Sequence, residues 1–206
     1  MPKDSKLNPF LNKGATKEIE FKCEELDFFL DIVSLEKEER DTIQRILKQA
    51  KSLPAALRGQ HGTYQGGLYD HTLLVTNLAY NIYNDSLIKN IDLNKILLTS
   101  IYHDFGKVSY YGFKKKLPNR KVSVRPIDRI EANNKNISTF KLIGVDNHID
   151  ECIAVLDKYK LPYDEEIHRA ILFHHGCFSL YEPFAPNRLA TMVYTADVIA
   201  TRIYRI

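Results

Sequence analysis

The stretch DLNKILLTSIYHDFGK, residues 92–107, combines a helix pattern with reactive side chains at its end. Asp92 is a typical N-cap residue, apolar residues follow at helical spacing, and Gly106 marks the expected end of the helix. The pair His103 and Asp104 could be ordinary surface polarity at a helix end. It becomes a chemical site only if other parts of the chain supply partners that neither packing nor capping requires.

The segments on either side of this stretch also have helical periodicity. Apolar residues recur three and four positions apart in 35–53, 66–86, 146–160, 164–175 and from Pro186 onward. The last segment is the most regular and has an apolar stripe made of Leu189, Met192, Val193, Ala196, Ile199, Ala200 and Ile203. We therefore predict an all-α fold, a bundle of helices.

One insertion interrupts the helical pattern. Residues 108–140 have Val and Tyr runs around an LPNR turn, which predicts a short β-hairpin or a long loop inserted into the bundle. The polar residues 1–20 are expected to form a loosely ordered lead-in. Residues 21–206 are then predicted to form one domain, because a chain of this length most simply does so.

The composition is that of an ordinary globular protein, with 44% hydrophobic and 27% charged residues. Three widely spaced cysteines without a CxxC motif argue against a disulfide framework and against a thiolate zinc site. No window approaches the roughly 18 apolar residues of a membrane span, and the first residues lack the apolar core of a signal peptide. We expect a cytoplasmic protein with no membrane partner; oligomeric state is not indicated.

Several histidines and one aspartate occupy positions that packing alone does not explain. His71 lies on the apolar stripe of its helix, and Asp197 lies on the apolar face of the last helix. A buried carboxylate is costly unless a cation or hydrogen-bond donors compensate it. A salt bridge from a distant Lys or Arg is one explanation for Asp197. Metal ligation explains both residues together, with further candidate ligands at His103, Asp104, His148, His174 and His175.

Imidazole and carboxylate ligands without thiolates suit Mn²⁺, Fe²⁺ or Fe³⁺, Co²⁺, Ni²⁺ or Zn²⁺. The set of candidates exceeds what one tetrahedral zinc ion needs, which favours two divalent ions that share a carboxylate over one ion. Neighbouring residues on a helix project about 100° apart, so His103 and Asp104 can reach one centre at a helix terminus. Asp104 can then also bridge two ions.

The order of these residues resembles that of the HD superfamily of metal-dependent phosphohydrolases. GQHGTYQGGLYDHTLLV (59–75) looks like the entry helix of HD-domain 3′→5′ exoribonucleases, and YHDFGK (102–107) matches the HDxGK form of the signature. HHG (174–176) followed by ATMVYTADVIAT (190–201) matches the closing segment. The resemblance, over about residues 50–204, implies an HD-type helical bundle. Small phage-encoded HD hydrolases, which act on nucleotides, share this layout.

The resemblance also implies roles for individual residues. His71, His103, Asp104 and Asp197 would hold a first metal ion. His148 and His174, with His175 as a further candidate, would hold a second ion, and Asp104 would lie between the two. Asp104 and Lys107 are the expected catalytic residues, since the matching lysine faces the substrate phosphate in many HD enzymes.

The chain departs from the exoribonucleases in two respects. It has no room for their oligonucleotide-binding domain, and His61-Gly62 stands where they have a His-His pair. A purely local explanation of Lys107 is that of a cation at the C-terminal end of a helix, favoured by the helix dipole.

Basic residues are concentrated directly after the candidate metal site. Between 107 and 129 a single acid, Asp128, stands among many cations, with aromatic residues interleaved. Basic groups can hold phosphates and rings can stack bases, although a solvated surface hairpin is an equal alternative. Candidate substrate contacts are Lys107, Lys114, Lys116, Arg120 and Arg125, together with Arg58, His61 and Tyr64, which could equally form a structural turn.

The favoured function is hydrolysis of a phosphoester or phosphoanhydride bond in a nucleotide or a single-stranded nucleic acid. Two other functions remain open. One is that of a di-iron oxygenase on the HD fold, which uses nearly the same ligands. The other is that of a non-catalytic, nucleotide-binding regulatory module, against which the filled ligand positions count.

Overall fold

The computed structural model describes residues 23–56, 61–86, 90–112, 148–179 and 185–206, and none of these forms a β-strand. The helices are α1 (Leu26–Ile32), α2 (Lys37–Ala50), α3 (Gly67–Asp85), α4 (Leu93–Tyr102), α5 (Gly106–Gly112), α7 (His148–Tyr159), α8 (Glu165–Phe173), the 3₁₀ turn η3 (Gly176–Phe178), α9 (Arg188–Ile199) and the π-helical turn η4 (Ala200–Tyr204). The predicted all-α fold is confirmed for the described residues.

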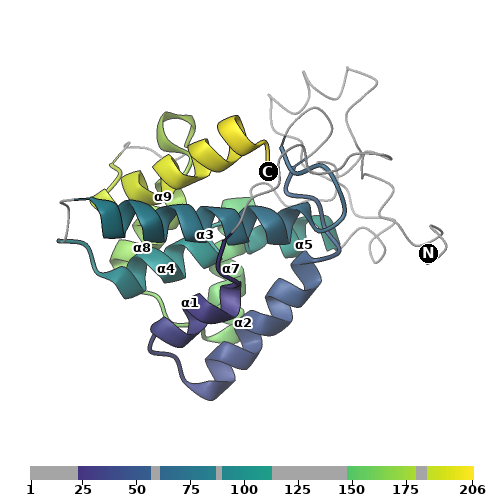
Figure 1. Ribbon diagram of the computed structural model, residues 1–206. Helices are drawn as coiled ribbons and strands as arrows, with labels where there is room; N and C mark the ends of the chain where they lie inside the picture. Colours follow the sequence, from purple (N-terminus) through teal and green to yellow (C-terminus); the bar gives the residue numbers. More distant parts are fainter. Residues whose placement is uncertain (1–22, 57–60, 87–89, 113–147, 180–184) are drawn as a thin grey trace.

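The long helix α3 lies at the centre of the bundle. It packs against α4 and against α9, and Figure 1 shows it running across the middle of the molecule between them. The helices α1 and α2 cover one side, where the predicted apolar residues Ile43, Ile46 and Leu47 are all at most 4% exposed. This arrangement removes residues 71–77 of α3 from water, so the polar side chains in that part of the helix, including His71, are buried.

Helix starts are set by local capping. The predicted N-cap of α4 is confirmed, because the Asp92 side chain accepts a hydrogen bond from the backbone N–H of Asn94. Asp164 caps α8 and Asn187 caps α9 in the same way, each accepting from a backbone N–H three residues on. These caps fix the residues at which α4, α8 and α9 begin.

The expected stop at Gly106 is wrong in detail. Helix α4 ends at Tyr102, a turn follows, and Gly106 begins α5 instead of ending a helix. The backbone N–H of Lys107 bonds to Asp104 O and that of Val108 to Phe105 O, which continues the chain into a new helix. Lys107 therefore lies in a first turn, and the explanation of it as a C-terminal helix cation is wrong.

The predicted hairpin or loop at 108–140 is corrected at its beginning. Residues 108–112 are helical, because α5 packs against α7 and this contact stabilises a helix where the Val and Tyr run favoured a strand. Residues 113–140 of that prediction lie outside the described residues, as does the lead-in 1–20.

The last helix changes its winding near its end. After Ile199 the chain forms the π-helical turn η4, in which each turn holds more residues than in an α-helix. The wider turn rotates Ile203 off the apolar stripe, so this residue is 61% exposed instead of buried as its spacing predicted. The chain then brings Ile206, which is fully buried, back onto the bundle.

No helix among the residues that the structure describes has the length and apolar content needed to cross a membrane.

Candidate metal centre

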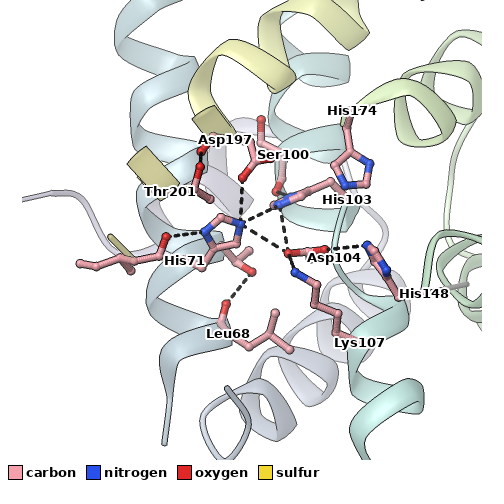
Figure 2. Close-up of polar contacts among 12 residues, drawn as sticks. Leu68, His71, Ser100, His103, Asp104, Lys107, His148, His174, Asp197 and Thr201 are labelled. Carbon is pink, nitrogen blue, oxygen red and sulfur yellow. Dashed lines mark hydrogen bonds and ion pairs between the residues drawn. The ribbon is translucent and has the colours of Figure 1, made fainter. Parts of the chain in front are cut away.

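The predicted ligands come together from five separate parts of the bundle. His71 projects from α3, His103 and Asp104 from the turn after α4, and His148 from the first residue of α7. Figure 2 shows Asp104 in the middle, with His71 and His103 on one side and His148 on the other. The remaining residues arrive from the end of α8 and from α9; they are His174, His175 and Asp197.

A first group of donor atoms surrounds His71. Its Nε2 lies 3.2 Å from His103 Nε2, 3.4 Å from Asp104 Oδ2 and 3.3 Å from Asp197 Oδ1. Ligands that bind one ion at about 2.1 Å are separated from one another by roughly 3.0–3.4 Å. The spacing is therefore that of groups sharing a cation, and His71, His103 and Asp104 can hold a divalent metal ion.

A second group lies on the other side of Asp104. His148, His174 and His175 each offer a nitrogen, and these atoms all lie within 4.8 Å of one another. The second carboxylate oxygen of Asp104, Oδ1, is 3.6 Å from His148 Nε2. Asp104 thus turns one oxygen towards each group of histidines.

Backbone carbonyls orient three of the imidazoles. The Nδ1 atoms of His71, His103 and His174 lie 2.9, 2.7 and 2.6 Å from the carbonyl oxygens of Ile206, Ser100 and Ile171. A carbonyl can only accept, so each Nδ1 carries the proton and each Nε2 is left with its lone pair. Metal-ligating histidines are held in this way by a hydrogen bond from the other ring nitrogen.

The lone pairs on the Nε2 atoms of His71 and His103 bear on whether a metal ion fits this site. His71 Nε2 and His103 Nε2 become two acceptors 3.2 Å apart, with carboxylate oxygens beside them and no proton between. Within the described part of the chain, the buried atoms His174 Nε2 and Asp104 Oδ1 also have no hydrogen-bond partner. Facing acceptors repel one another unless a cation lies among them, so the donor set fits a metal.

The protonation states favour metal binding as well. Burial lowers the pKa of His174 to about 4 and that of His175 to about 3, so both rings are neutral at neutral pH. Burial alone would raise the pKa of Asp104, but the Lys107 ammonium, together with the neighbouring histidines when they are protonated, outweighs burial and holds that pKa well below its ordinary value. Neutral imidazoles and ionised carboxylates are the forms that bind metal ions.

Asp197 has no competing explanation in the described residues. Burial would raise the pKa of its carboxyl, yet His71, when its ring is protonated, outweighs burial and lowers that pKa below the ordinary value. No Lys or Arg side chain in the described ranges forms an ion pair with it; its ion-pair partner there is His71, at 3.3 Å. The salt-bridge alternative for Asp197 thus finds no support in that part of the chain.

Lys107 lies inside the centre and touches its middle carboxylate. Its Nζ donates to Asp104 Oδ2 at 2.6 Å, and the lysine side chain is only 9% exposed. Figure 2 shows the side chain rising from α5 towards Asp104. The buried ammonium is thus within reach of any group that binds next to that carboxylate.

The predicted substrate contacts His61 and Tyr64, both before α3, lie in different surroundings: His61 is next to the candidate ligands and Tyr64 is not. The ring of His61 lies 5.0 Å from that of His71, and its buried Nε2 has no hydrogen-bond partner among the described residues. Tyr64 instead donates its hydroxyl to Asp70 at 2.8 Å, which braces the turn before α3. The other predicted contacts, Arg58, Lys114, Lys116, Arg120 and Arg125, lie outside the described residues.

Sequence reasoning missed the groups that hold the ligands in place. Ser100, Ile171 and Ile206 act through their main-chain oxygens, which every residue has, so no side-chain pattern signals them. The sequence did contain one signal, Gly106 of the HDFGK motif, which begins α5 at its contact with α7.

Fold and donor set together define a class, that of all-α proteins with a histidine and aspartate metal centre. The comparison with family models identifies the family: residues 68–202 match the model of the HD domain, and the chain belongs to that family. HD domains bind divalent metals and are generally metal-dependent phosphohydrolases. Searches of curated proteins and of solved structures gave no significant match.

Proposed function

We propose that this protein hydrolyses a phosphoester or phosphoanhydride bond of a nucleotide or single-stranded nucleic acid, using two divalent metal ions. The observation that carries the proposal is Asp104, whose two oxygens face two separate groups of histidines at 3.4 and 3.6 Å. A carboxylate placed in this way is the natural bridge of a two-ion centre.

The proposed ligands divide between the two sides of that carboxylate. His71, His103 and Asp197 would hold one ion on the Oδ2 side. His148 and His174 would hold the other on the Oδ1 side, with His175 as an additional ligand. When bound, two such ions lower the pKa of a water molecule towards neutrality and offset charge on a phosphoryl group.

The chain contributes further charge next to this centre. Lys107 Nζ is buried against Asp104 and can donate to a phosphate oxygen that approaches the same carboxylate. The imidazole of His61, buried beside His71, can donate a hydrogen bond to another oxygen of the substrate. Both side chains would then orient the phosphoryl group.

The nucleotide part of the proposal is supported by charge. The sequence from 107 to 129 contains eight Lys and Arg residues against the single acid Asp128, with Tyr110, Tyr111 and Phe113 among them. A polyanion with stacked bases is the ligand that this composition suits.

The test combines a metal measurement with an activity screen. Purified protein should contain about two divalent ions per chain and should release phosphate or mononucleotides in a screen of nucleotides, cyclic dinucleotides and single-stranded RNA and DNA with Mn²⁺, Fe²⁺, Co²⁺ or Mg²⁺. Asp104→Ala should abolish the activity. The matched control is Asp31→Ala, which removes an exposed carboxylate paired with Arg40 and should change nothing.

The same experiment separates the two other functions. Full activity in Asp104→Ala, or in chelated protein, would refute the metal mechanism. Turnover that requires O₂, with a mixed-valence di-iron signal in electron paramagnetic resonance, would replace hydrolysis by oxygenase chemistry. Nucleotide binding without any turnover would identify a regulatory module.

A further inference from the structure

His148 lies at the beginning of a helix, whereas His174 and His175, the other ligands of the proposed second ion, follow the end of one. It is the first residue of α7, so its position follows from how α7 lies against the turn between α4 and α5. Its Nε2 lies 3.6 Å from Oδ1 of Asp104, which belongs to the turn that leads into α5. Whatever sets the spacing of α5 and α7 therefore also sets the distance between this ligand and Asp104.

Gly106 is the point of closest approach between the two helices. A Cβ atom built there would lie 2.6 Å from the backbone nitrogen of Cys152 and 2.8 Å from the carbonyl carbon of His148, and closer still to that carbonyl's oxygen. The neighbour is backbone and not the flexible end of a side chain, so it cannot move aside cheaply. Only a residue without a side chain permits this contact.

The requirement for glycine here is steric and not conformational. The glycines with positive φ among the described residues are Gly62, Gly66 and Gly176, and Gly106 is not one of them. Alanine could therefore adopt the Gly106 backbone conformation without strain. What it could not do is leave α7 where it is.

A second contact fixes α7 at the same place. The thiol of Cys152, which is fully buried, donates to the carbonyl oxygen of Tyr102 at 2.8 Å. Tyr102 and Phe105, on either side of the ligand pair, are themselves at most 3% exposed in the core. The turn that holds His103 and Asp104 is thus anchored in the bundle, and α7 is docked onto it by Gly106 and Cys152.

We propose that Gly106 and Cys152 are positioning residues that set the separation of the two metal subsites by docking α7. This inference rests on the proposed two-ion centre and adds residues that bind neither metal nor substrate. Relief of the alanine contact requires a displacement well above roughly 1 Å, because the Cβ atom would approach the His148 carbonyl oxygen more closely than the carbonyl carbon at 2.8 Å, and carbon atoms pack at about 3.5–4.0 Å. Metal–ligand distances tolerate about 0.2 Å, so the His148 subsite should fail while the His71 subsite remains.

In the experiment, protein freed of metal by a chelator, which is then removed, is titrated with Mn²⁺ alone. Binding is followed by calorimetry and by electron paramagnetic resonance. The wild type should bind two ions with an exchange-coupled spectrum. Gly106→Ala should bind one ion, with the spectrum of an isolated Mn²⁺ and the first-ion affinity changed less than about threefold. Cys152→Ala, which loses the thiol contact without adding a clash, should weaken the second ion about tenfold, as supporting residues typically do.

The matched control is Leu156→Ala, which truncates a fully buried side chain on the same helix without pushing α7 away from α5. It should lower thermal stability and still bind two ions. Two coupled ions in Gly106→Ala, or loss of the second ion in Leu156→Ala as well, would overturn the inference. If Gly106→Ala does not fold, unchanged second-ion affinity in Cys152→Ala overturns it. A wild type that binds fewer than two ions would instead refute the two-ion centre itself.

Discussion

Replacement of Lys107 by methionine should expose how the centre balances its charge. Methionine keeps an unbranched side chain of similar length and removes only the ammonium, which donates to Asp104 Oδ2 at 2.6 Å. Both side chains are nearly buried, at 9% and 2% exposed, so solvent screens the pair little. Of the neighbouring charges that hold the pKa of Asp104 low against its burial, Lys107 is the strongest.

The magnitude follows from burial of an unpaired carboxylate. Removing one partner of a buried ion pair costs about 3–5 kcal/mol. For a domain of about 200 residues each kcal/mol lowers the melting temperature by roughly 2–4 °C, so chelated Lys107→Met should melt about 10 °C below chelated wild type. In protein saturated with Mn²⁺ the metal supplies the missing positive charge, and the difference should shrink to a few degrees.

The assay is thermal unfolding of wild type and variant at pH 7.5, each with chelator and with saturating Mn²⁺. The control is Lys95→Met, which removes another lysine with two carboxylate partners, Asp164 and Glu166, each at 2.7 Å. Lys95 is 28% exposed, and its partners lie at the start of α8, whereas the proposed ligand His174 follows the end of that helix. Its loss should therefore cost about 1 kcal/mol or less with or without metal. An equal loss of stability for Lys107→Met in both conditions, or none with chelator, would refute the reasoning.

Two further outcomes are expected. Chelated protein should lose stability as the pH falls from about 6.5 towards 4, because burial holds the pKa of His174 at about 4 and that of His61 at about 3. The unfolded chain then binds protons that the folded chain excludes, at about 1.4 kcal/mol per pH unit for each histidine; denaturant melts that are unchanged between pH 7 and 5 would contradict this. His61→Asn should raise KM about tenfold with unchanged metal content, since His61 lies beside the proposed ligands and outside both donor groups; loss of metal in this variant would make it a ligand instead.

Local features of the fold were predictable from the sequence because their causes are local. The N-cap at Asp92 depends on one side chain and the backbone N–H two residues on, and α7 begins at His148, within two residues of the start of the predicted segment 146–160. The apolar spacing of Ile43, Ile46 and Leu47 likewise needs only the helical period to predict a buried face.

The errors in the predicted fold have tertiary causes. The Val and Tyr run after Gly106 favours a strand by composition, yet its first residues are helical because α5 rests on α7. The spacing of Ile203 assumes a regular α-helix, but the π-helical turn before it changes the rotation per residue and exposes the side chain. Neither the close helix contact nor the change of winding leaves a periodic signal.

By itself, the sequence determined which donor types the chain contains and that they fall at helix ends and on apolar helix faces, where packing does not require them. Only the tertiary structure decided that the two oxygens of Asp104 face different histidines and that the Lys107 ammonium is buried against Oδ2 of that carboxylate. It also decided that the Tyr64 hydroxyl donates to Asp70. The reason is physical. His71 Nε2 and Asp197 Oδ1 belong to residues 126 positions apart in the sequence, yet they lie 3.3 Å from each other. Helix packing and the backbone carbonyl that orients the His71 ring set this distance. The packing and the carbonyl contact do not follow from the residue type of the ligands.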